Sequence, residues 1–374
     1  MEDWKEYKLG EAISFKNGKK RNNTEGCFPI YGGNGILGYS NETNYENCVI
    51  IGRVGAYCGS VFYEKSSCWV SDNAISAIPK EGFDTQFCYY LLSQLQLNKR
   101  CIGTGQPLLT QEILNRITVT LPPLPTQQKI AQILSSLDDK IELNNKINAN
   151  LEQQAQALFK SWFVDFEPFG GEMPAGWKVV PLEELCTVVT KGTTPTTLGK
   201  QFTEEGINFI KGESILDNHT FDLQKISHID EATNTLLKRS VIEENDILFT
   251  IAGTLGRFAM IDDSLTPANT NQAVGIIRAN QHNISPYFLY SFFIGNWHND
   301  YYSKRIQQAV QANLSLGTIK SLPILIPDNS NMEKYTNVIE PIFKQMKQLE
   351  NENKKLSNLR DTLLPKLMNG EIEV

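Results

Sequence analysis

The feature that most constrains the fold of this 374-residue chain is that its motifs occur twice, in the same order. The matched stretches are WK at 4–5 and 177–178, IGRVG at 51–55 and IAGTLG at 251–256, SDNA at 71–74 and TNQA at 270–273, and QPLLT at 106–110 and QANLS at 311–315. The last pair is displaced by 205 residues (311 − 106), and the same displacement carries Leu121-Pro122 onto Ile326-Pro327. Loose matches in a shared order indicate an internal duplication. The length also exceeds one ordinary domain, so we expect two diverged copies of one unit.

Each copy is expected to contain a globular part of mixed helix and strand, followed by one long helix. Runs rich in β-branched and aromatic residues, such as 48–51, 60–63 and 116–120, predict strands. Asp84 is placed to cap a helix in the first copy, and Ser285 before Pro286 begins the matching helix in the second. The predicted fold class is α+β, with two pseudo-symmetric mixed α/β domains separated by two long antiparallel helices that form a coiled-coil spacer. The predicted order is a domain at 1–125, a helix at 126–163, a domain at 164–330, and a helix with a tail at 331–374.

The two long helices are predicted from apolar residues spaced alternately four and three apart, as in a coiled-coil seam. The residues expected to pack are Leu134, Leu137, Ile141 and Leu151 in the first helix, and Ile342, Leu349, Leu356 and Leu359 in the second, where the apolar stripe begins at Val338. Asn144 and Asn148 occupy seam positions, where polar residues fix register and orientation. Thr126 is expected to cap the first helix, and Pro341 and Pro365 are expected to bend the start and the end of the second.

The duplication favours mutual packing of the two helices over two separate amphipathic helices on different domain surfaces. A pseudo-two-fold axis would make the pair antiparallel and bring the two ends of the chain together.

Composition is typical of a globular protein, with 41% hydrophobic and 21% charged residues, and we expect the protein to be cytoplasmic. No run approaches 18 apolar residues, so we expect no membrane partner, and the N-terminal MEDWK is unlike a signal peptide. Seven scattered cysteines predict free buried thiols in a reducing compartment. The net charge of −7 does not exclude a nucleic-acid partner, because a local basic face can bind phosphate on an acidic protein.

A glycine pattern, Gly33-x-Gly35-x-x-Gly38, matches the letters of a dinucleotide-binding loop. That loop requires a following helix whose N-terminus meets the pyrophosphate. Residues 39–45 are mainly polar, contain two tyrosines and lack helical periodicity, so they predict neither a helix nor a cofactor site. We expect a glycine-rich surface loop that allows close approach to a flat or grooved partner.

The sequence shows no recognisable set of catalytic residues. It lacks a phosphate-binding GxxxxGK[ST] loop and an HExxH zinc pair, and its four histidines all lie between His219 and His298. The histidine and cysteine spacings suit no tetrahedral metal site. We therefore expect a protein that recognises a ligand without transforming it, with no cofactor or metal on this chain. Two alternatives stay open: a self-contained cofactor-dependent enzyme, and a coiled-coil adaptor for other proteins.

Two similar domains on a helical spacer suit a ligand with a repeat of its own, and double-stranded DNA presents equivalent sites about one turn apart. Amide, hydroxyl and cationic side chains match the hydrogen-bonding groups of bases and phosphates. The candidate DNA-binding residues of the first copy are Lys19, Lys20, Arg21, Asn34, Arg53, Asn73 and Gln106. Those of the second copy are Lys191, Thr193, Thr194, Lys211, Arg257, Asn271, Gln272 and Asn313. In the first copy we expect the cluster at 19–21 to meet phosphates and the other residues to reach base edges.

Five stretches, taken in order, resemble the specificity subunit of type I restriction-modification systems over essentially the full chain. They are PIYGGNG at 29–35, WVSDNAI at 69–75, TVTLPPLPTQQKI at 118–130, WFVDFEP at 162–168 leading into MPAGW at 173–177, and LLPKLMNGE at 363–371. The resemblance implies two target-recognition domains, each reading one half of a bipartite DNA site. It also implies that the long helices dock two modification (methyltransferase) subunits that carry S-adenosylmethionine and methylate adenine. The restriction (motor-nuclease) subunits, which use ATP and Mg, would join the complex through these modification subunits. The specificity subunit itself would be non-catalytic.

Overall fold

The computed structural model describes residues 3–20, 25–103, 105–303 and 313–374. The chain divides into two compact units: unit 1 comprises residues 1–145 and 350–374, and unit 2 comprises residues 146–349. The boundary crosses both long helices, α4 (Leu124–Phe163) and α9 (Asn329–Met368), so each unit contains part of each helix. Among the described residues, no helix is both long and apolar enough to cross a membrane.

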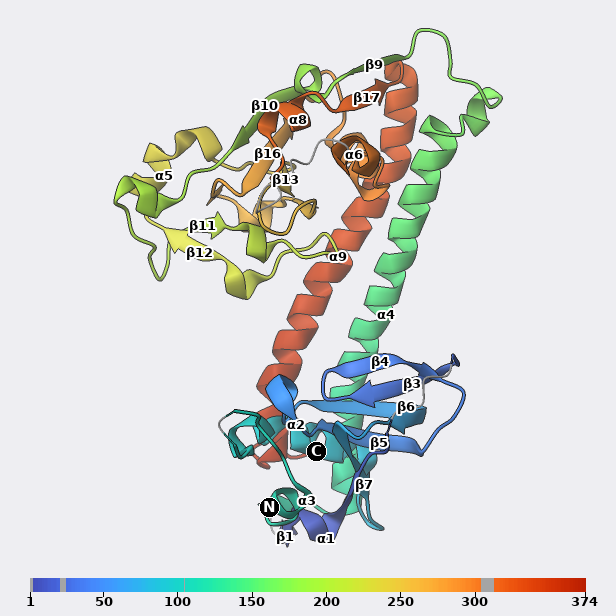
Figure 1. Ribbon diagram of the computed structural model, residues 1–374, viewed down its shortest axis with the longest axis vertical. Helices are drawn as coiled ribbons and strands as arrows, with labels where there is room; N and C mark the ends of the chain where they lie inside the picture. Colours follow the sequence, from blue (N-terminus) through green and yellow to red (C-terminus); the bar gives the residue numbers. More distant parts are fainter. Residues whose placement is uncertain (1–2, 21–24, 104, 304–312) are drawn as a thin grey trace. The chain divides into compact units, whose positions relative to one another are not determined.

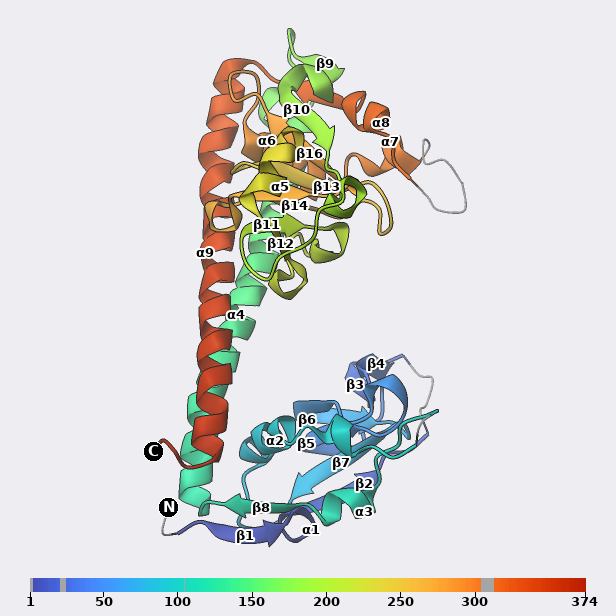
Figure 2. The same cartoon turned by 90° about the vertical axis from the view of Figure 1, so that its left-hand side faces the viewer.

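Unit 1 is built on a six-stranded sheet with the strand order β2-β7-β5-β6-β3-β4 (Figure 1). Its elements before α4 are β1 (Lys5–Lys8), α1 (Leu9–Ala12), β2 (Ile13–Asn17), β3 (Phe28–Gly32), β4 (Gly35–Ser40), β5 (Tyr45–Gly52), β6 (Val61–Val70), β7 (Ala74–Pro79), α2 (Thr85–Gln94), α3 (Gln111–Asn115) and β8 (Thr118–Leu121). Asp84 caps α2 as expected, because its carboxylate accepts a hydrogen bond from the Phe87 amide at 2.8 Å. Helix α2 lies between the sheet and α4 (Figure 2), where Tyr90 donates to Asp138 at 2.5 Å.

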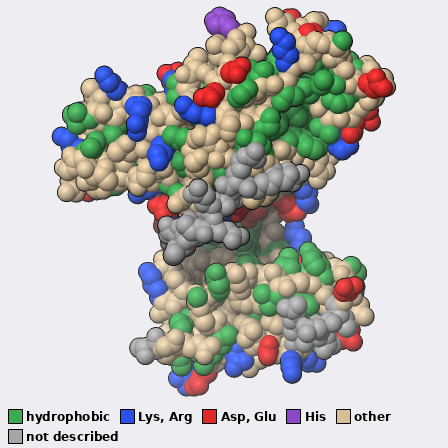
Figure 3. Space-filling view, turned by 45° about the horizontal axis from the view of Figure 1, so that its top comes forward, with side chains coloured by type: hydrophobic (Ala, Val, Ile, Leu, Met, Phe, Trp, Pro, Cys, Tyr) green, Lys and Arg blue, Asp and Glu red, His purple; other side chains and the backbone are tan. Residues whose placement is uncertain are grey.

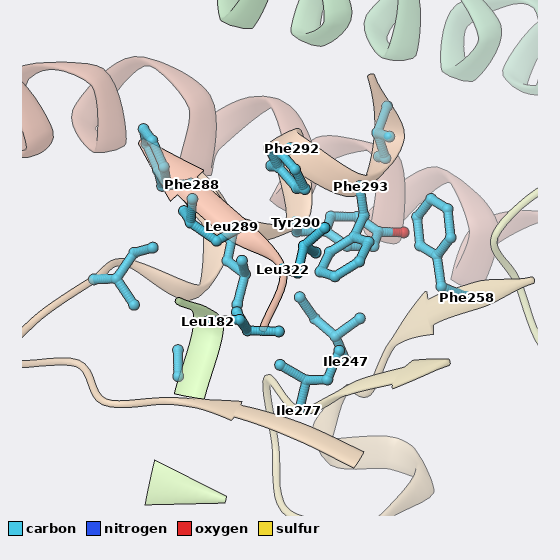
Figure 4. Packing of buried hydrophobic residues seen from close by; sticks show 14 of the residues in the cluster. Leu182, Ile247, Phe258, Ile277, Phe288, Leu289, Tyr290, Phe292, Phe293 and Leu322 are labelled. Atoms are coloured by element: carbon cyan, nitrogen blue, oxygen red, sulfur yellow. The ribbon is translucent and has the colours of Figure 1, made fainter. Parts of the chain in front are cut away.

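Unit 2 repeats this plan with a four-stranded sheet of order β10-β16-β13-β14 and a three-stranded sheet of order β12-β11-β15. Its elements are β9 (Lys178–Pro181), β10 (Cys186–Lys191), β11 (Ile207–Ile210), β12 (Ser227–Ile229), α5 (Glu231–Leu236), β13 (Ile247–Thr250), β14 (Phe258–Met260), β15 (Ala268–Thr270), β16 (Val274–Ala279), α6 (Pro286–Ile294), α7 (Asn299–Ser303), α8 (Leu316–Lys320) and β17 (Pro323–Ile326). Aromatic side chains of α6, including Phe288 and Phe293, fill the core beside the sheet (Figure 4). The ring centroid of Phe163 in α4 lies 4.8 Å from that of Phe288 in α6 and 4.8 Å from that of Tyr335 in α9. This packing fixes the long helices to the core of unit 2.

The duplication is visible in the bounds of the elements. Adding 205 to the ends of β8 gives 323–326, which are the ends of β17. Adding 205 to the ends of α4 gives 329–368, which are the ends of α9. The strand orders also match, because β2, β7, β5 and β6 correspond in turn to β10, β16, β13 and β14. The expectation of two copies of one unit is therefore confirmed.

One pair of equivalent glycines shows why the copies share a turn after their first sheet strand. A Cβ atom added at Gly18 would lie 2.0 Å from the carbonyl oxygen of Ser71, and one at Gly192 would lie 1.8 Å from that of Thr270. Atoms cannot approach so closely, so a side chain at either position would force the two loops apart.

The long helices run antiparallel within each unit, as expected. In unit 1 the Asn144 amide donates to Asn353 and Glu352 at 2.8 Å, and Arg360 pairs with Asp138 at 2.7 Å. In unit 2 Asn148 donates to the Met346 carbonyl at 3.2 Å. Along the pair, residue numbers therefore increase in one helix in the direction in which they decrease in the other. Both chain ends lie in unit 1, where Trp4 and Val374 line one pocket.

Several details of the helices differ from expectation. Helix α4 begins at Leu124, so Thr126 lies inside it and does not cap it. Helix α9 begins at Asn329 and includes both Pro341 and Pro365, so neither proline ends the helix, and the expected bends at the two prolines stay predictions. Leu359 is 47% exposed and Val338 is 46% exposed, so neither lies in the buried seam, and those two expectations are wrong. The neighbouring residues Arg360 and Ile339 face inward instead, which shows that the stripe is displaced by one position at both points.

The cysteines also differ from expectation. Cys58 and Cys101 form a disulfide within unit 1, so not all thiols are free. The thiols of Cys48 and Cys68 are buried and lie 3.8 Å apart. Burial raises the pKa of the Cys88 thiol to about 12, which keeps it protonated at neutral pH.

Candidate nucleic-acid interface

The predicted loops of unit 1 are brought together by backbone hydrogen bonds. The Arg53 amide donates to the carbonyl of Asn73 at 3.0 Å, and the Lys19 amide donates to that of Val70 at 3.0 Å. The Gly55 amide donates to the carbonyl of Pro107 at 2.9 Å, next to Gln106. We call this set loop surface 1, formed by residues 18–20, 33–34, 53–55, 71–73 and 106–107. Arg21 lies outside the described residues.

The glycine-rich stretch joins loop surface 1 as a hairpin between β3 and β4. Gly35 has a φ of +85°, a value that favours glycine. Gly33 packs close to the backbone at Gly52 and Asn73, and its carbonyl accepts a hydrogen bond from Ser60. Strand β4 follows the turn, so the prediction that no helix follows the glycines is confirmed. Asn34, at the tip, is exposed and can contact a ligand.

Unit 2 carries the equivalent set, which we call loop surface 2, formed by residues 191–194, 211–212, 251–257, 271–273 and 313. The Gly192 amide donates to the carbonyl of Asn271 at 3.1 Å, and the Ile251 amide donates to that of Ala273 at 2.8 Å. Ala252 forms a β-bridge with Asn313. The structure therefore gathers the predicted residues of the second copy on neighbouring loops.

The two loop surfaces share one hydrogen bond at the same place in the duplication. Leu109 donates to the carbonyl of Arg53, and Leu314 donates to that of Ile251, each at 2.9 Å. The following residues, Thr110 and Ser315, cap α3 and α8 through their side-chain oxygens. The loops are thus held by equivalent contacts in both units.

The predicted side chains differ in how free they are to bind. Exposed members are Lys19, Lys20, Asn34, Asn73, Gln106, Lys191, Gln272 and Asn313. Three others already have partners: Asn271 accepts from the Ala273 amide at 3.1 Å, Lys211 lies 4.6 Å from the ring centre of Phe202, and Thr194 hydrogen bonds to Gln272. Arg53 is half-buried and donates to the carbonyl of Asp72 at 3.4 Å.

Sequence reasoning missed two residues that contact loop surface 2 from neighbouring segments. Arg239 donates to the Lys191 carbonyl and the Thr193 hydroxyl, each at 3.4 Å. Asp217 binds Arg257 through both carboxylate oxygens, each at 2.6 Å. Neither residue lies in a repeated motif, so no signal in the sequence pointed to it.

Charge on the visible face of unit 2 is dispersed, because its lysines and arginines do not form one block (Figure 3). In the described part of the chain, no group of three or more His, Cys, Asp and Glu side chains could hold a metal ion.

Replacing Lys20 with alanine is expected to weaken binding to all DNA sequences equally. Lys20 is exposed on loop surface 1, and one lost phosphate contact reduces the slope of log K against log salt by about 0.9. Binding to target and random duplexes across a salt series measures this. Lys129→Ala removes the same charge from an exposed position on α4, outside loop surface 1, and should leave the slope unchanged. Altered target choice with unchanged nonspecific affinity would contradict the phosphate assignment.

Comparison with known proteins agrees with this geometry. The family model described as "Type I restriction modification DNA specificity domain" matches residues 1–153 and 174–359. The chain is 26% identical to the MjaIX specificity subunit of Methanocaldococcus jannaschii, over 84% of this chain and 76% of that one. It is 28% identical to the HindI specificity subunit of Haemophilus influenzae, over 71% of each. The fold matches the S subunit crystal structure from M. genitalium with a TM-score of 0.67 and 17% identity, covering 97% of this chain and 96% of that one.

The family model matches a segment in each copy of the duplication, so the chain is a two-domain DNA specificity protein. The chain belongs to the type I restriction-modification DNA specificity family. It is a specificity subunit with two target-recognition domains.

Proposed function

We propose that loop surfaces 1 and 2 each read one half of a bipartite site in double-stranded DNA. The observation that carries this proposal is the repeated loop set, held by the Leu109–Arg53 and Leu314–Ile251 hydrogen bonds at 2.9 Å. Loops that are fixed by their backbones can hold base-reading side chains in constant positions. Exposed amides at Asn73 and Asn313 can pair with adenine edges, and lysines can contact phosphates.

We further propose that the long helices dock two modification subunits. Helices α4 and α9 carry exposed apolar side chains, among them Leu143, Val338 and Leu359. Apolar side chains on the outside of a helix are suited to burial against a partner. The partner would supply S-adenosylmethionine and the methyl transfer, and restriction subunits would bring ATP and Mg. This chain would bind DNA and partners and would hold no cofactor.

Exchanging residues 164–328 with those of a relative is expected to change one half of the methylated motif completely and leave the other half intact. These residues lie between the end of α4 and the start of α9. Aromatic contacts connect the exchanged segment to the retained helices, from Trp177 to Phe163 of α4 and from Phe288 to Tyr335 of α9. The relative that supplies the segment must therefore have aromatic residues at the positions of Trp177 and Phe288. Sequencing methylated bases in cells that carry the chimera and its modification subunit gives the result.

The matched control exchanges residues 1–123, which should change only the opposite half. A motif altered in both halves by either exchange would contradict independent reading. A chain that supports no sequence-specific methylation, and binds only proteins, would instead be an adaptor. Methylation by the isolated chain would make it an enzyme.

A further inference from the structure

The guanidinium of Arg257 in loop surface 2 is held on one edge by the protein itself. Its Nε and Nη2 atoms each donate to one carboxylate oxygen of Asp217 at 2.6 Å. Its Nη1 atom donates to the carbonyl of Ile215 at 3.3 Å. The Arg257 side chain is 24% exposed, whereas that of Asp217 is 80% exposed. The ion pair therefore lies at the surface, with the arginine set into it.

The backbone on the arginine side of the pair is fixed. The buried Thr250 hydroxyl accepts a hydrogen bond from the Arg257 amide at 2.9 Å, and the Thr250 amide donates to the Arg257 carbonyl at 2.8 Å. Within this loop, Gly253 and Gly256 have φ values of +77° and +83°. These values favour glycine, so the tight turn depends on both residues.

The Asp217 side of the pair is fixed through His219. The His219 ring stacks on Phe258, the residue after Arg257, with 4.1 Å between ring centroids. The Leu216 amide donates to the Thr220 carbonyl at 2.9 Å and closes the turn that contains Asp217. Burial lowers the pKa of His219, so this contact is between uncharged rings at neutral pH.

The hydrogen bonds leave part of the guanidinium available. An arginine has five N–H donors, and three of them are used by Asp217 and Ile215. One N–H on Nη1 and one on Nη2 remain, on the two terminal nitrogens of the guanidinium, so the side chain can still donate to two acceptors of one ligand. Two such donors match the O6 and N7 acceptors of guanine in the major groove.

The charge of the pair distinguishes a base from a phosphate. Arg257 and Asp217 together carry no net charge, and the exposed carboxylate would repel a phosphate. The uncharged acceptors of a guanine edge avoid this repulsion. An exposed ion pair contributes little to stability by itself, so its effect lies mainly in orienting the arginine.

We propose that Arg257 reads a guanine in the half-site of unit 2 and that Asp217 is its positioning residue. The proposal rests on the proposed function, because it needs loop surface 2 to face the DNA. Arg53 in loop surface 1 donates to a backbone carbonyl, so we assign the arrangement to unit 2 alone.

The test uses the full chain with its modification subunit and duplexes that contain the methylated motif. Each guanine of the unit 2 half-site is replaced in turn by 7-deazaguanine, which lacks the N7 acceptor, or by 2-aminopurine, which lacks O6. The wild-type protein should lose roughly tenfold in affinity at one guanine only. Asp217→Asn should bind the unmodified duplex more weakly and lose most of the difference between guanine and its analogues at that position. Arg257→Lys, which keeps the charge, should behave in the same way.

The control is Glu112→Gln, because Glu112 in α3 of unit 1 forms an exposed pair with Arg116 and its replacement removes the same charge. It should leave guanine discrimination in the unit 2 half-site unchanged. Thermal unfolding of Asp217→Asn should match that of the wild type, since the side chain is exposed. If Asp217→Asn keeps the full analogue penalty, or weakens all guanine positions equally, the positioning role is wrong. If the wild type methylates no bipartite motif, the proposed function itself fails.

Discussion

Inserting one heptad into each long helix is expected to move the two methylated half-sites apart by about three base pairs. The insertions follow Asn145 in α4 and Leu349 in α9, at the boundary between the units, so the contacts within each unit stay intact. Both helices are continuous there. Seven residues at ~1.5 Å each lengthen a helix by ~10 Å, and one base pair occupies ~3.4 Å. Seven residues also preserve the heptad seam.

Sequencing of methylated bases measures the new spacing, and the bases of each half should be unchanged. The control places the heptad in α4 alone, which mismatches the two helices and should abolish methylation. If the doubly lengthened protein assembles and methylates at the original spacing, the helices do not set the distance between half-sites.

Replacing Asp246 with alanine is expected to destabilise unit 2 by about 3–5 kcal/mol. Asp246 is fully buried, and its two carboxylate oxygens accept hydrogen bonds from Nε and Nη2 of Arg278 at 2.8 and 2.7 Å. Burial raises the pKa of the Asp246 carboxyl, and the hydrogen bonds from Arg278 oppose that rise. Removing the carboxylate leaves a largely buried guanidinium without its main partner. Hydrogen exchange of β13 and β16 in the full chain reports the loss within unit 2.

The matched control is Glu243→Gln, since Glu243 pairs with the same arginine but is 62% exposed. Its loss should change the free energy of unfolding by less than about 1 kcal/mol. The double replacement Asp246→Leu with Arg278→Met should recover most of the stability, because neither charge remains buried. An equal effect of Asp246→Ala and Glu243→Gln would contradict the importance of the buried pair.

The internal duplication shows how much of the fold follows from sequence. The displacement of 205 residues between short motifs also relates α4 to α9 and β8 to β17. The polar residues after Gly38 correctly predicted that no helix follows it, and Asp84 was correctly predicted to cap a helix. These features depend on the spacing of apolar residues and on turn chemistry, which act between neighbours in the chain.

The contacts between the helices depended on tertiary structure. A heptad pattern identifies a stripe, but the neighbouring helix and the domain core decide which side of the stripe is buried. Asp138 and Arg360 form an ion pair in unit 1, and a displacement of 205 residues carries them to Phe343 and Ala155 in the apolar core of unit 2. Equivalent positions therefore use different chemistry, because each packs against a different set of side chains.

The sequence alone determined that this chain carries two similar sets of polar loops and two long helices, because repeats, periodicity and turn residues are local properties. Only the tertiary structure decided which side chains of those loops meet. Arg257 lies 40 residues from Asp217, and Cys58 lies 43 residues from Cys101. Neither pair has a sequence pattern of its own. Each is brought together by strand register and loop closure, so its chemistry emerges only when the whole domain folds.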